Sequence, residues 1–372
     1  MSTLKTPFRY DFVGSFLRPE KLKTAKKAFE EGTITQEELD RITDECVTEI
    51  VAKQKAAGFH AITDGEFRRK FWHLDFMWGF EGVAHEKDGG GVQFNGEMAD
   101  LEATYLVGKV KAKAHPFVEY FKFLKQFEDE QTVAKYTIPA PAQMYQQMIV
   151  PQNIEQTRKF YATDEELIED IAKAYQDVIK QFYAAGCRNL QLDDCTWGMF
   201  ADKIGHTLYG TTREGIVEFQ KAHKDINDKV IANAPKDMII NTHVCRGNFH
   251  STYASEGAYD SVADILFGEE NVNAYFLEFD DERSGGFAPL AKVSGEKKVV
   301  LGLITTKSPV LEDKQLVIDR IHDAAKYIPL ERLYLSSQCG FASCEIGNKL
   351  TEEEQWAKLR LVKEVAEEVW GK

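Results

Sequence analysis

The sequence predicts an α/β protein of the (β/α)8 TIM-barrel class, in which residues 1–372 form one barrel domain with an inserted hairpin segment near the barrel mouth. Eight short apolar runs alternate with amphipathic helix patterns, which is the order expected of a parallel sheet wrapped by helices. Doubly wound sheets also alternate strands and helices, but the sequence lacks the early G-x-G-x-x-G motif that would favour such a sheet. Polar residues follow most of the runs, and in barrels the carboxyl ends of the strands carry the chemistry.

The predicted strands are short, rich in apolar residues, and bounded by glycine or polar residues. In order, they are 8–13, 59–63, 135–138, 187–192, the run 238–240 leading into 241–246, 272–278, 298–303 and 332–336. Strands this short suit the wall of a barrel.

Four helix starts carry the capping sequence Ser/Thr-x-x-Glu, in which the first side chain accepts a hydrogen bond from the backbone of the fourth residue. They are Thr35–Glu38, Thr163–Glu166, Thr211–Glu214 and Thr351–Glu354. Gly58 and Gly186 are predicted to end the first two helices, because glycine readily adopts the left-handed conformation that closes a helix.

Residues 81–113 interrupt the alternation of strands and helices. A turn is predicted at the glycines 89–91, and the alternating pattern of 105–111 indicates a strand of a hairpin. We interpret the segment as an insertion that caps one end of the domain, with a surface ornament as the alternative.

Composition limits the function. A formal net charge of −14 and a pI of about 5.2 argue against a general nucleic-acid or anionic-membrane surface. Six cysteines without C-x-x-C spacing do not suggest a disulfide framework. The start of the chain lacks an apolar signal region, and no apolar run approaches the roughly 20 residues that span a bilayer. We therefore expect a cytoplasmic protein, and a homodimer is left open.

Four side chains near strand ends predict a metal site. His243 and Cys245 point the same way where the fifth strand ends, Glu278 closes the sixth, and Cys339 follows the eighth. An imidazole, a carboxylate and two thiolates are zinc ligands, and they converge if the strands are parallel neighbours. The alternative is that the cysteines are small buried hydrophobes and the histidine a hydrogen-bonded core residue.

Such a ligand set would carry, with Zn²⁺, a formal charge of about minus one. A metal in this state activates water poorly, but it still lowers the pKa of a bound thiol and leaves the sulfur nucleophilic. The set therefore favours alkyl transfer to a thiol over hydrolysis.

A second group of polar residues predicts an amino-acid pocket. Glu66 and Asp193 lie at different strand ends of the same rim, and two carboxylates suit a bound ammonium group. Ser15, beside exposed backbone N–H groups, suits a carboxylate. The alternatives are a helix N-cap for Asp193, a surface charge for Glu66 and a turn hydroxyl for Ser15.

Seven motifs occur in an order that resembles the catalytic domain of cobalamin-independent methionine synthase. They are Val13–Phe16, Asp64–Glu66, Gln191–Asp193, Thr242–Cys245, Phe276–Glu278, Lys307–Pro309 and Gln338–Gly340. The resemblance implies a (β/α)8 barrel that uses zinc to activate homocysteine for methylation by a methylated folate. It further implies zinc on the four residues named above, the amino group of homocysteine on Glu66 and Asp193, and its carboxylate near Gly14 and Ser15.

Two departures from the family pattern are visible. The chain resembles the single-barrel branch, for which we leave the methyl donor open, and Lys307 stands where the family has a proton-handling histidine. Lys307 could stabilise charge on the donor or handle a proton. Aromatic side chains could stack on a pterin ring of the methyl donor, and basic side chains could bind its carboxylates or phosphates. The alternatives are that the aromatic residues pack in the core and that the basic residues form a solvated face. These residues are Trp72, Phe76, Trp78, Trp197, Arg68, Arg69 and Lys70.

The sequence therefore predicts a zinc-dependent methyltransferase that converts homocysteine to methionine, with Asp193 and Lys307 as catalytic residues. One alternative is a zinc-dependent alkyltransferase or lyase that acts on a different small thiol. The other, from a different class, is a non-catalytic protein that binds zinc or a thiol.

Overall fold

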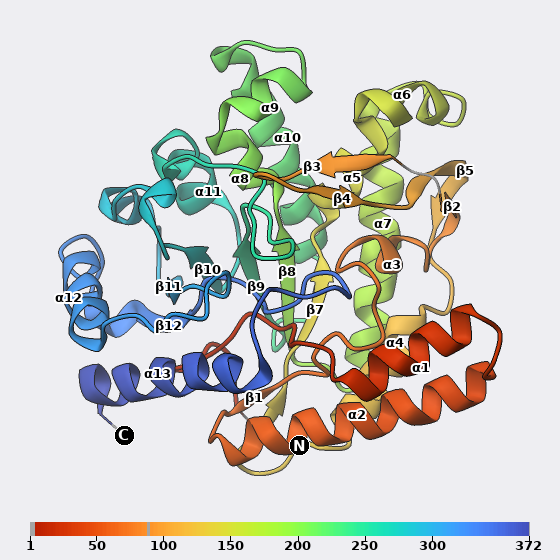
Figure 1. The fold of residues 1–372 in the computed structure, drawn as a ribbon. Coiled ribbons are helices and arrows are strands. Elements are labelled where there is room, and N and C mark those ends of the chain that lie inside the picture. The colour runs from red at the N-terminus through yellow and green to blue at the C-terminus, as the bar shows by residue number, and fades with distance from the viewer. Residues whose placement is uncertain (1–3, 88–89, 372) are drawn as a thin grey trace.

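The computed structural model describes residues 4–87 and 90–371, and its centre is a six-stranded parallel sheet in consecutive order (Figure 1). The strands are β7 (Tyr136–Pro139), β8 (Asn189–Asp194), β9 (Ile239–Val244), β10 (Ala274–Glu278), β11 (Lys298–Ile304) and β12 (Leu333–Ser337). Every neighbouring pair is parallel, so all six carboxyl ends lie at one rim.

Two further segments close the barrel. β1 (Ala61–Ile62) pairs in parallel with β6 (Val133–Ala134), which leads directly into β7. On the other side, Tyr10 forms a parallel bridge to Leu335 of β12. The predicted TIM-barrel class is thereby confirmed.

The first predicted strand, 8–13, is not a regular strand beyond the bridge at Tyr10. The reason is local: the carboxylate of Asp11 accepts hydrogen bonds from the backbone N–H groups of Phe8 and Phe12. These donors are therefore satisfied within the segment rather than across a ladder.

The four predicted helices are present as α2 (Gln36–Ala56), α7 (Asp164–Ala184), α10 (Arg213–Ile231) and α13 (Glu352–Trp370). Thr35, Thr163 and Thr351 cap them as predicted, each accepting a backbone N–H. The prediction was wrong by one residue at α10, where Thr212 rather than Thr211 accepts from the N–H of Gly215.

The remaining helices are mostly short, and three of them begin with proline, whose fixed φ suits a first helical turn. They are α1 (Glu20–Glu30), α3 (Leu74–Met77), α4 (Pro116–Lys125), α5 (Pro141–Ile149), α6 (Pro151–Thr157), α8 (Thr196–Ala201), α9 (Lys203–Leu208), α11 (Ala263–Glu269) and α12 (Lys314–Ala324), with 3-10 turns η1 (Tyr259–Ser261), η2 (Glu282–Ser284), η3 (Ala288–Lys292) and η4 (Leu330–Arg332). Among the described residues, no helix combines the length and the apolar composition that crossing a membrane requires.

The interior of the barrel is filled rather than hollow. Val13, Phe276, Val300 and Tyr334 form a small buried cluster, and Lys135 pairs with Asp11 at 2.7 Å with both side chains fully buried. Most other apolar side chains pack in two larger clusters that include strand and helix residues. Because the interior is closed by side chains, ligands meet the barrel at its carboxyl rim.

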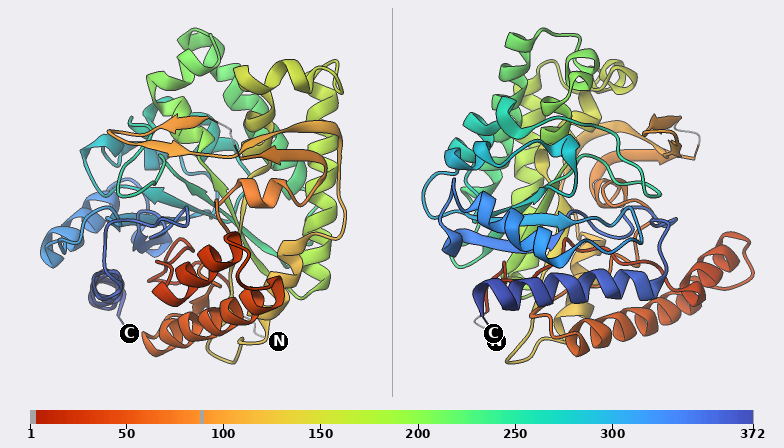
Figure 2. Two further views of the ribbon diagram at one scale, coloured as in Figure 1. Left: turned by 45° about the vertical axis from the view of Figure 1, so that its right-hand side comes forward. Right: turned by 60° about the vertical axis from the view of Figure 1, so that its left-hand side comes forward.

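Residues 81–111 stand apart from the alternation of strands and helices. β2 (Glu81–Glu86) pairs antiparallel with β5 (Ala103–Lys111), and β3 (Gly91–Gln93) pairs antiparallel with β4 (Met98–Asp100). The turn predicted at 89–91 lies partly outside the described residues. The insertion, drawn in orange, crosses in front of the sheet in Figure 1 and in the left view of Figure 2.

Candidate active site

The four predicted metal ligands lie together. Donor atoms of His243, Cys245, Glu278 and Cys339 are all within 4.8 Å of one another, and all four side chains are buried. His243 and Glu278 come from the ends of β9 and β10, and the cysteines from the loops after β9 and β12. Strand order thus brings residues almost one hundred positions apart to one point.

His243 is oriented by its backbone surroundings. Its Nδ1–H donates to the carbonyl oxygen of Phe276 at 3.2 Å, which leaves Nε2 as the lone-pair nitrogen. Nε2 is buried and has no hydrogen-bond partner among the described residues. A buried nitrogen without a partner is costly unless a ligand occupies it, and this arrangement is typical of a metal-binding histidine.

The two thiols are adjacent, with 3.7 Å between the Sγ atoms of Cys245 and Cys339. The N–H of Gly247 donates to the sulfur of Cys245 at 3.2 Å. The contact with Cys245 and burial raise the pKa of Cys339 well above its ordinary value. Two thiolates at this distance therefore need a nearby cation, as in a zinc site.

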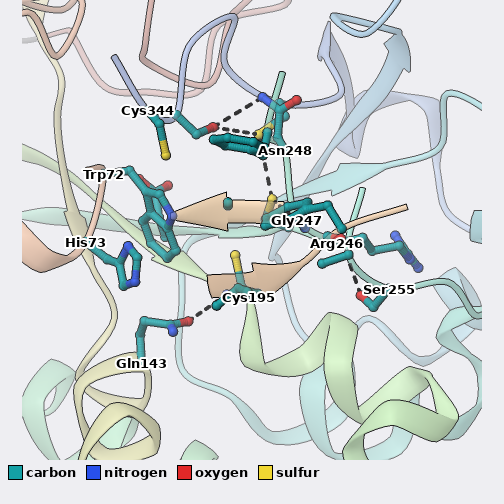
Figure 3. A pocket seen from close by; sticks show the side chains of 18 of the residues that line it. Trp72, His73, Gln143, Cys195, Arg246, Gly247, Asn248, Ser255 and Cys344 are labelled. Atoms are coloured by element: carbon teal, nitrogen blue, oxygen red, sulfur yellow. Dashed lines mark hydrogen bonds between the residues drawn. The ribbon is translucent and has the colours of Figure 1, made fainter. Parts of the chain in front are cut away.

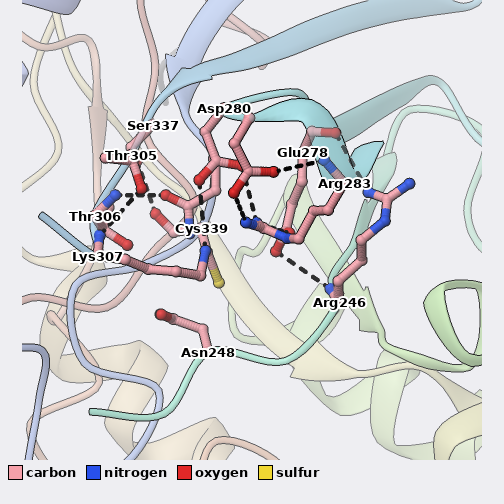
Figure 4. A network of polar contacts seen from close by, with 12 residues as sticks. Arg246, Asn248, Glu278, Asp280, Arg283, Thr305, Thr306, Lys307, Ser337 and Cys339 are labelled. Carbon is pink, nitrogen blue, oxygen red and sulfur yellow. Dashed lines mark hydrogen bonds and ion pairs between the residues drawn. The ribbon is translucent and has the colours of Figure 1, made fainter. Parts of the chain in front are cut away.

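Glu278 is held as a carboxylate by surrounding positive charge (Figure 4). It accepts from the N–H of Arg246 at 3.2 Å and from Nη2 of Arg283 at 3.0 Å. Burial alone would raise the pKa of Glu278, but Lys307, Arg283 and Arg246 lower it to about 2. Lys307 itself lies 3.6 Å from Asp280.

The predicted acidic pair is present beside this group. Asp193 accepts from Gln191 at 2.8 Å, and Glu66 accepts from the hydroxyl of Thr137 at 2.8 Å. Burial and the charge of Glu66 raise the pKa of Asp193 to about 8. A ligand ammonium group between the two carboxylates would relieve this repulsion, which is the chemistry expected of an amine pocket.

The backbone at Glu66 has an uncommon conformation. Its φ is +61°, and that of Gly65 is +67°. The N–H of Glu66 donates to the side chain of Asp64 at 2.9 Å, which closes a tight turn. A non-glycine residue in the left-handed region is held there by its surroundings, often at functional sites.

Ser15 and Gly14 pack tightly against the neighbouring loops. The hydroxyl of Ser15 accepts from the N–H of Ala342 at 3.2 Å. A Cβ on Gly340 would lie 1.9 Å from that hydroxyl oxygen, and a Cβ on Gly14 would lie 3.2 Å from Oε1 of Glu66. Glycine at these positions therefore permits the close approach of three loops.

One cavity of about 250 Å³ joins these groups (Figure 3). Its inner end is polar, and its lining there includes Ser15, Glu66, Asp193, His243, Cys245 and Cys339. We call the rest of the lining the outer end of the cavity; it is largely apolar, with amide side chains among aromatic and aliphatic ones. Gly14, Glu278 and Lys307 are not among the described residues that line it.

Cys195 was missed by the sequence analysis. Its side chain is buried in one cluster with Cys245 and Cys339, and its N–H donates to Gln143 at 3.3 Å. It directly follows Asp194, the last residue of β8. The signal that identified the other residues, a polar side chain at a strand end, was therefore available for this one.

The aromatic residues considered for donor binding lie in different surroundings. Trp72 lines the cavity, whereas Phe76 and Trp197 are fully buried in the core clusters. Trp78 stacks on His85 of the insertion, with 3.9 Å between ring centroids. The basic residues all have acidic partners: Arg68 pairs with Asp44 and Lys70 with Glu102, whereas Arg69 pairs with Glu66 of the acidic pair itself.

Comparisons with known proteins agree with this geometry. The model of the family described as cobalamin-independent synthase, catalytic domain, matches residues 10–368. The uncharacterised protein YxjG of Bacillus subtilis is 42% identical over 371 residues, which cover 98% of this chain and 96% of that protein. A methionine synthase of Saccharolobus solfataricus is 23% identical, over 88% of this chain and 86% of that protein.

Two solved structures are similar over nearly their whole length. A putative vitamin-B12 independent methionine synthase from Listeria monocytogenes has a TM-score of 0.78 and 34% identity, covering 99% of this chain and 100% of that one. A B12-independent methionine synthase from a Shewanella species, in complex with selenomethionine, has a TM-score of 0.72 and 20% identity, covering 97% of each chain. The chain therefore belongs to the family of cobalamin-independent methionine synthase catalytic domains.

Proposed function

We propose that the protein is a zinc-dependent methyltransferase that transfers a methyl group to the thiol of homocysteine and forms methionine. The observation that carries the proposal is the convergence, at one cavity, of four buried donor side chains and two buried carboxylates. The donor is a methylated folate or another methyl carrier.

His243, Cys245, Glu278 and Cys339 are the proposed zinc ligands. Three features support the fit: the partnerless Nε2 of His243, the adjacent thiols and the anionic Glu278. When bound, zinc lowers the pKa of a coordinating substrate thiol and so supplies a thiolate at neutral pH.

Glu66 and Asp193 are proposed to bind the amino group of homocysteine. Both carboxyl groups are buried, and an ammonium group between them would stabilise the ionised form of Asp193, whose pKa burial and Glu66 raise to about 8. The pocket therefore favours an ammonium group over an uncharged substituent. Gly14 and Ser15 lie beside them and are proposed to receive the carboxylate. Asp193 thereby fixes the direction in which the thiol enters the cavity, which is the catalytic role assigned to it here.

Lys307 is proposed as the second catalytic residue. Its ammonium group lies beside Asp280 and contributes to the low pKa of Glu278. A fixed cation at this place stabilises negative charge at the end of the cavity where the thiol reacts.

We further propose that the protein works in the cytoplasm, because the site needs free thiols. All six cysteines, which lie in the described ranges, are free. A homodimer stays a prediction.

Metal analysis, calorimetry and a turnover assay on one purified sample test the proposal. We expect about one zinc per chain, loss of activity on treatment with a chelator, and recovery when zinc is returned. Homocysteine should bind much more tightly than its des-amino analogue, because only an amine pocket discriminates between them. Equal binding of the two would favour a different thiol, and zinc binding without methionine from any methyl donor would favour a non-catalytic protein.

A further inference from the structure

Three loops at the carboxyl rim carry residues proposed above for the reaction. The loop after β9 carries Cys245, whereas the loop after β11 carries Lys307 and the loop after β12 carries Cys339, both shown in Figure 4. Each loop leaves a different strand, so the sheet alone does not fix the place of the two thiols. The distance between their sulfurs therefore depends on contacts between the loops.

One buried amide, that of Asn348 in the loop after β12, contacts all three loops. Asn348 is 6% exposed. Its Nδ2 donates to Oδ1 of Asn248 in the loop after β9 at 2.9 Å, and to the carbonyl oxygen of Thr306 in the loop after β11 at 2.8 Å. Its Oδ1 accepts from the backbone N–H of Ser251 at 2.9 Å. Because a backbone carbonyl only accepts and a backbone N–H only donates, these partners fix the direction of the amide.

The first two partners of this amide meet again beside Cys339. Nδ2 of Asn248 donates to the carbonyl oxygen of Gly340 at 2.7 Å, and the hydroxyl of Thr306 donates to the same oxygen at 3.0 Å. Gly340 directly follows Cys339 in the chain. A carbonyl group held by two donors from two other loops keeps the backbone at Cys339 in one place.

The loop after β9 depends on the same amide for its conformation. His250 and Ser251 have φ values of +45° and +68°, and successive left-handed residues other than glycine persist only where their surroundings hold them. Asn348 holds the N–H of Ser251, and the hydroxyl of Ser251 accepts from the N–H of Lys349 at 2.8 Å. The loop after β9 is therefore tied to the loop after β12 at these two points as well.

The two sulfurs lie where these loops meet. The Sγ atoms of Cys245 and Cys339 are 3.7 Å apart, and both side chains are buried. A ligand whose loop is already fixed loses little conformational freedom when it binds a metal ion. Hydrogen bonds that fix the two loops to one another therefore strengthen metal binding, although they belong to residues outside the ligand set.

We propose that Asn348 is a positioning residue of the metal site: by joining the loops after β9, β11 and β12, its amide places the sulfur of Cys339 against that of Cys245 before the metal binds. This role rests on the proposed function for the identity of the ligands. It goes beyond that function, because it assigns part of the affinity for the metal to a side chain that is not itself a proposed ligand.

Zinc affinity, measured on the folded metal-free protein by competition with a chelator, tests this role. Asn348→Ala removes the whole amide, whereas Asn348→Asp keeps its shape and its acceptor but has no donor at neutral pH. Both variants should bind zinc about 10- to 100-fold more weakly, which is the usual effect of losing a group that orients metal ligands. With Co²⁺ in place of zinc, both should also show an altered thiolate-to-metal charge-transfer band, because the sulfurs are no longer held in place.

Asn153→Ala is the matched control. Asn153 on α6 is 8% exposed, and its Nδ2 also donates to two backbone carbonyl oxygens, those of Thr104 and Gln147, at 2.8 and 2.7 Å. It is not among the described residues that line the cavity. This variant should lose thermal stability to a similar extent as Asn348→Ala, and it should keep the zinc affinity and the Co²⁺ spectrum of wild type.

Wild-type zinc affinity in both Asn348 variants would overturn the inference, and so would an equal loss of affinity in Asn153→Ala, because the effect would then follow stability alone. Thr306→Val, which removes only one donor to Gly340, replaces the Asn348 variants if they do not fold. Unchanged zinc affinity in Thr306→Val would then overturn the inference. Zinc binding that depends on Asn348 without formation of methionine would leave the inference standing and reject the proposed function, whereas a wild-type protein that binds no zinc would reject both.

Discussion

The two ends of the cavity are built in different ways. The inner end is made of strand ends and adjoining loops of the barrel, and its charged groups hold one another in place, as Arg283 holds Glu278. The outer end combines barrel loops with residues 90–101 of the insertion, which we call the insertion tip and which partly exposed ion pairs fasten. The comparison shows that the barrel supplies the buried charged groups of the cavity, whereas the insertion supplies part of its apolar wall.

The largest effect is expected when one proposed metal ligand at the inner end is removed. Cys339→Ser should lower the zinc content from about one per chain to near zero and reduce turnover more than about a hundredfold, because a hydroxyl is a poor zinc ligand. Metal analysis and turnover measure this change.

Cys187→Ser is the control for that variant. Cys187 is also fully buried, but it lies just before β8, at the amino end of that strand. Its variant should keep its zinc. Unchanged metal content in Cys339→Ser would show that the proposed ligand set is wrong.

A change in the amine pocket should leave the metal in place. Asp193→Asn should keep zinc and weaken homocysteine binding by about thirtyfold or more, because truncating one partner of a buried charge pair costs at least about 2 kcal/mol. Calorimetry with the des-amino analogue gives the contrast, since its affinity should hardly change. If homocysteine binds as before, Asp193 is not part of the pocket.

The smallest of these effects is expected at Lys307, which lies beside Asp280 and does not line the cavity. Lys307→Ala should slow turnover about tenfold or more with zinc and thiol binding preserved. Lys314→Ala, an exposed lysine on α12, should have no effect. Loss of zinc in Lys307→Ala would instead mean that the lysine acts by stabilising Glu278.

The fold was largely predictable because strands and capped helices carry local signals. The alternation of apolar runs identified the strands of the sheet, and capping threonines located three helix starts to the residue. The short helices were not predicted, because a single turn such as Leu74–Met77 has no periodic pattern to detect. The irregular first strand depends on the side chain of Asp11, which a pattern of apolar residues does not reveal.

For the site, the sequence predicted those residues that lie at the ends of strands. His243, Glu278 and Asp193 could be grouped because parallel neighbours share a rim. The outer end could not be predicted in this way. Whether Phe94 reaches the cavity depends on the path of the insertion and on the space left by Gly247, and both are properties of the folded chain. The division of the chain into one barrel and an insertion at about 81–113 stays a prediction.

The loop after β9 connects the two ends. Its first residues offer N–H groups to Glu278 and to Cys245, and its later residues receive the insertion tip. A ligand that shifts this loop from outside must therefore alter the affinity of whatever binds inside, and thermodynamic reciprocity makes the reverse effect equal in size. The two ends of the cavity are therefore coupled through a single stretch of backbone.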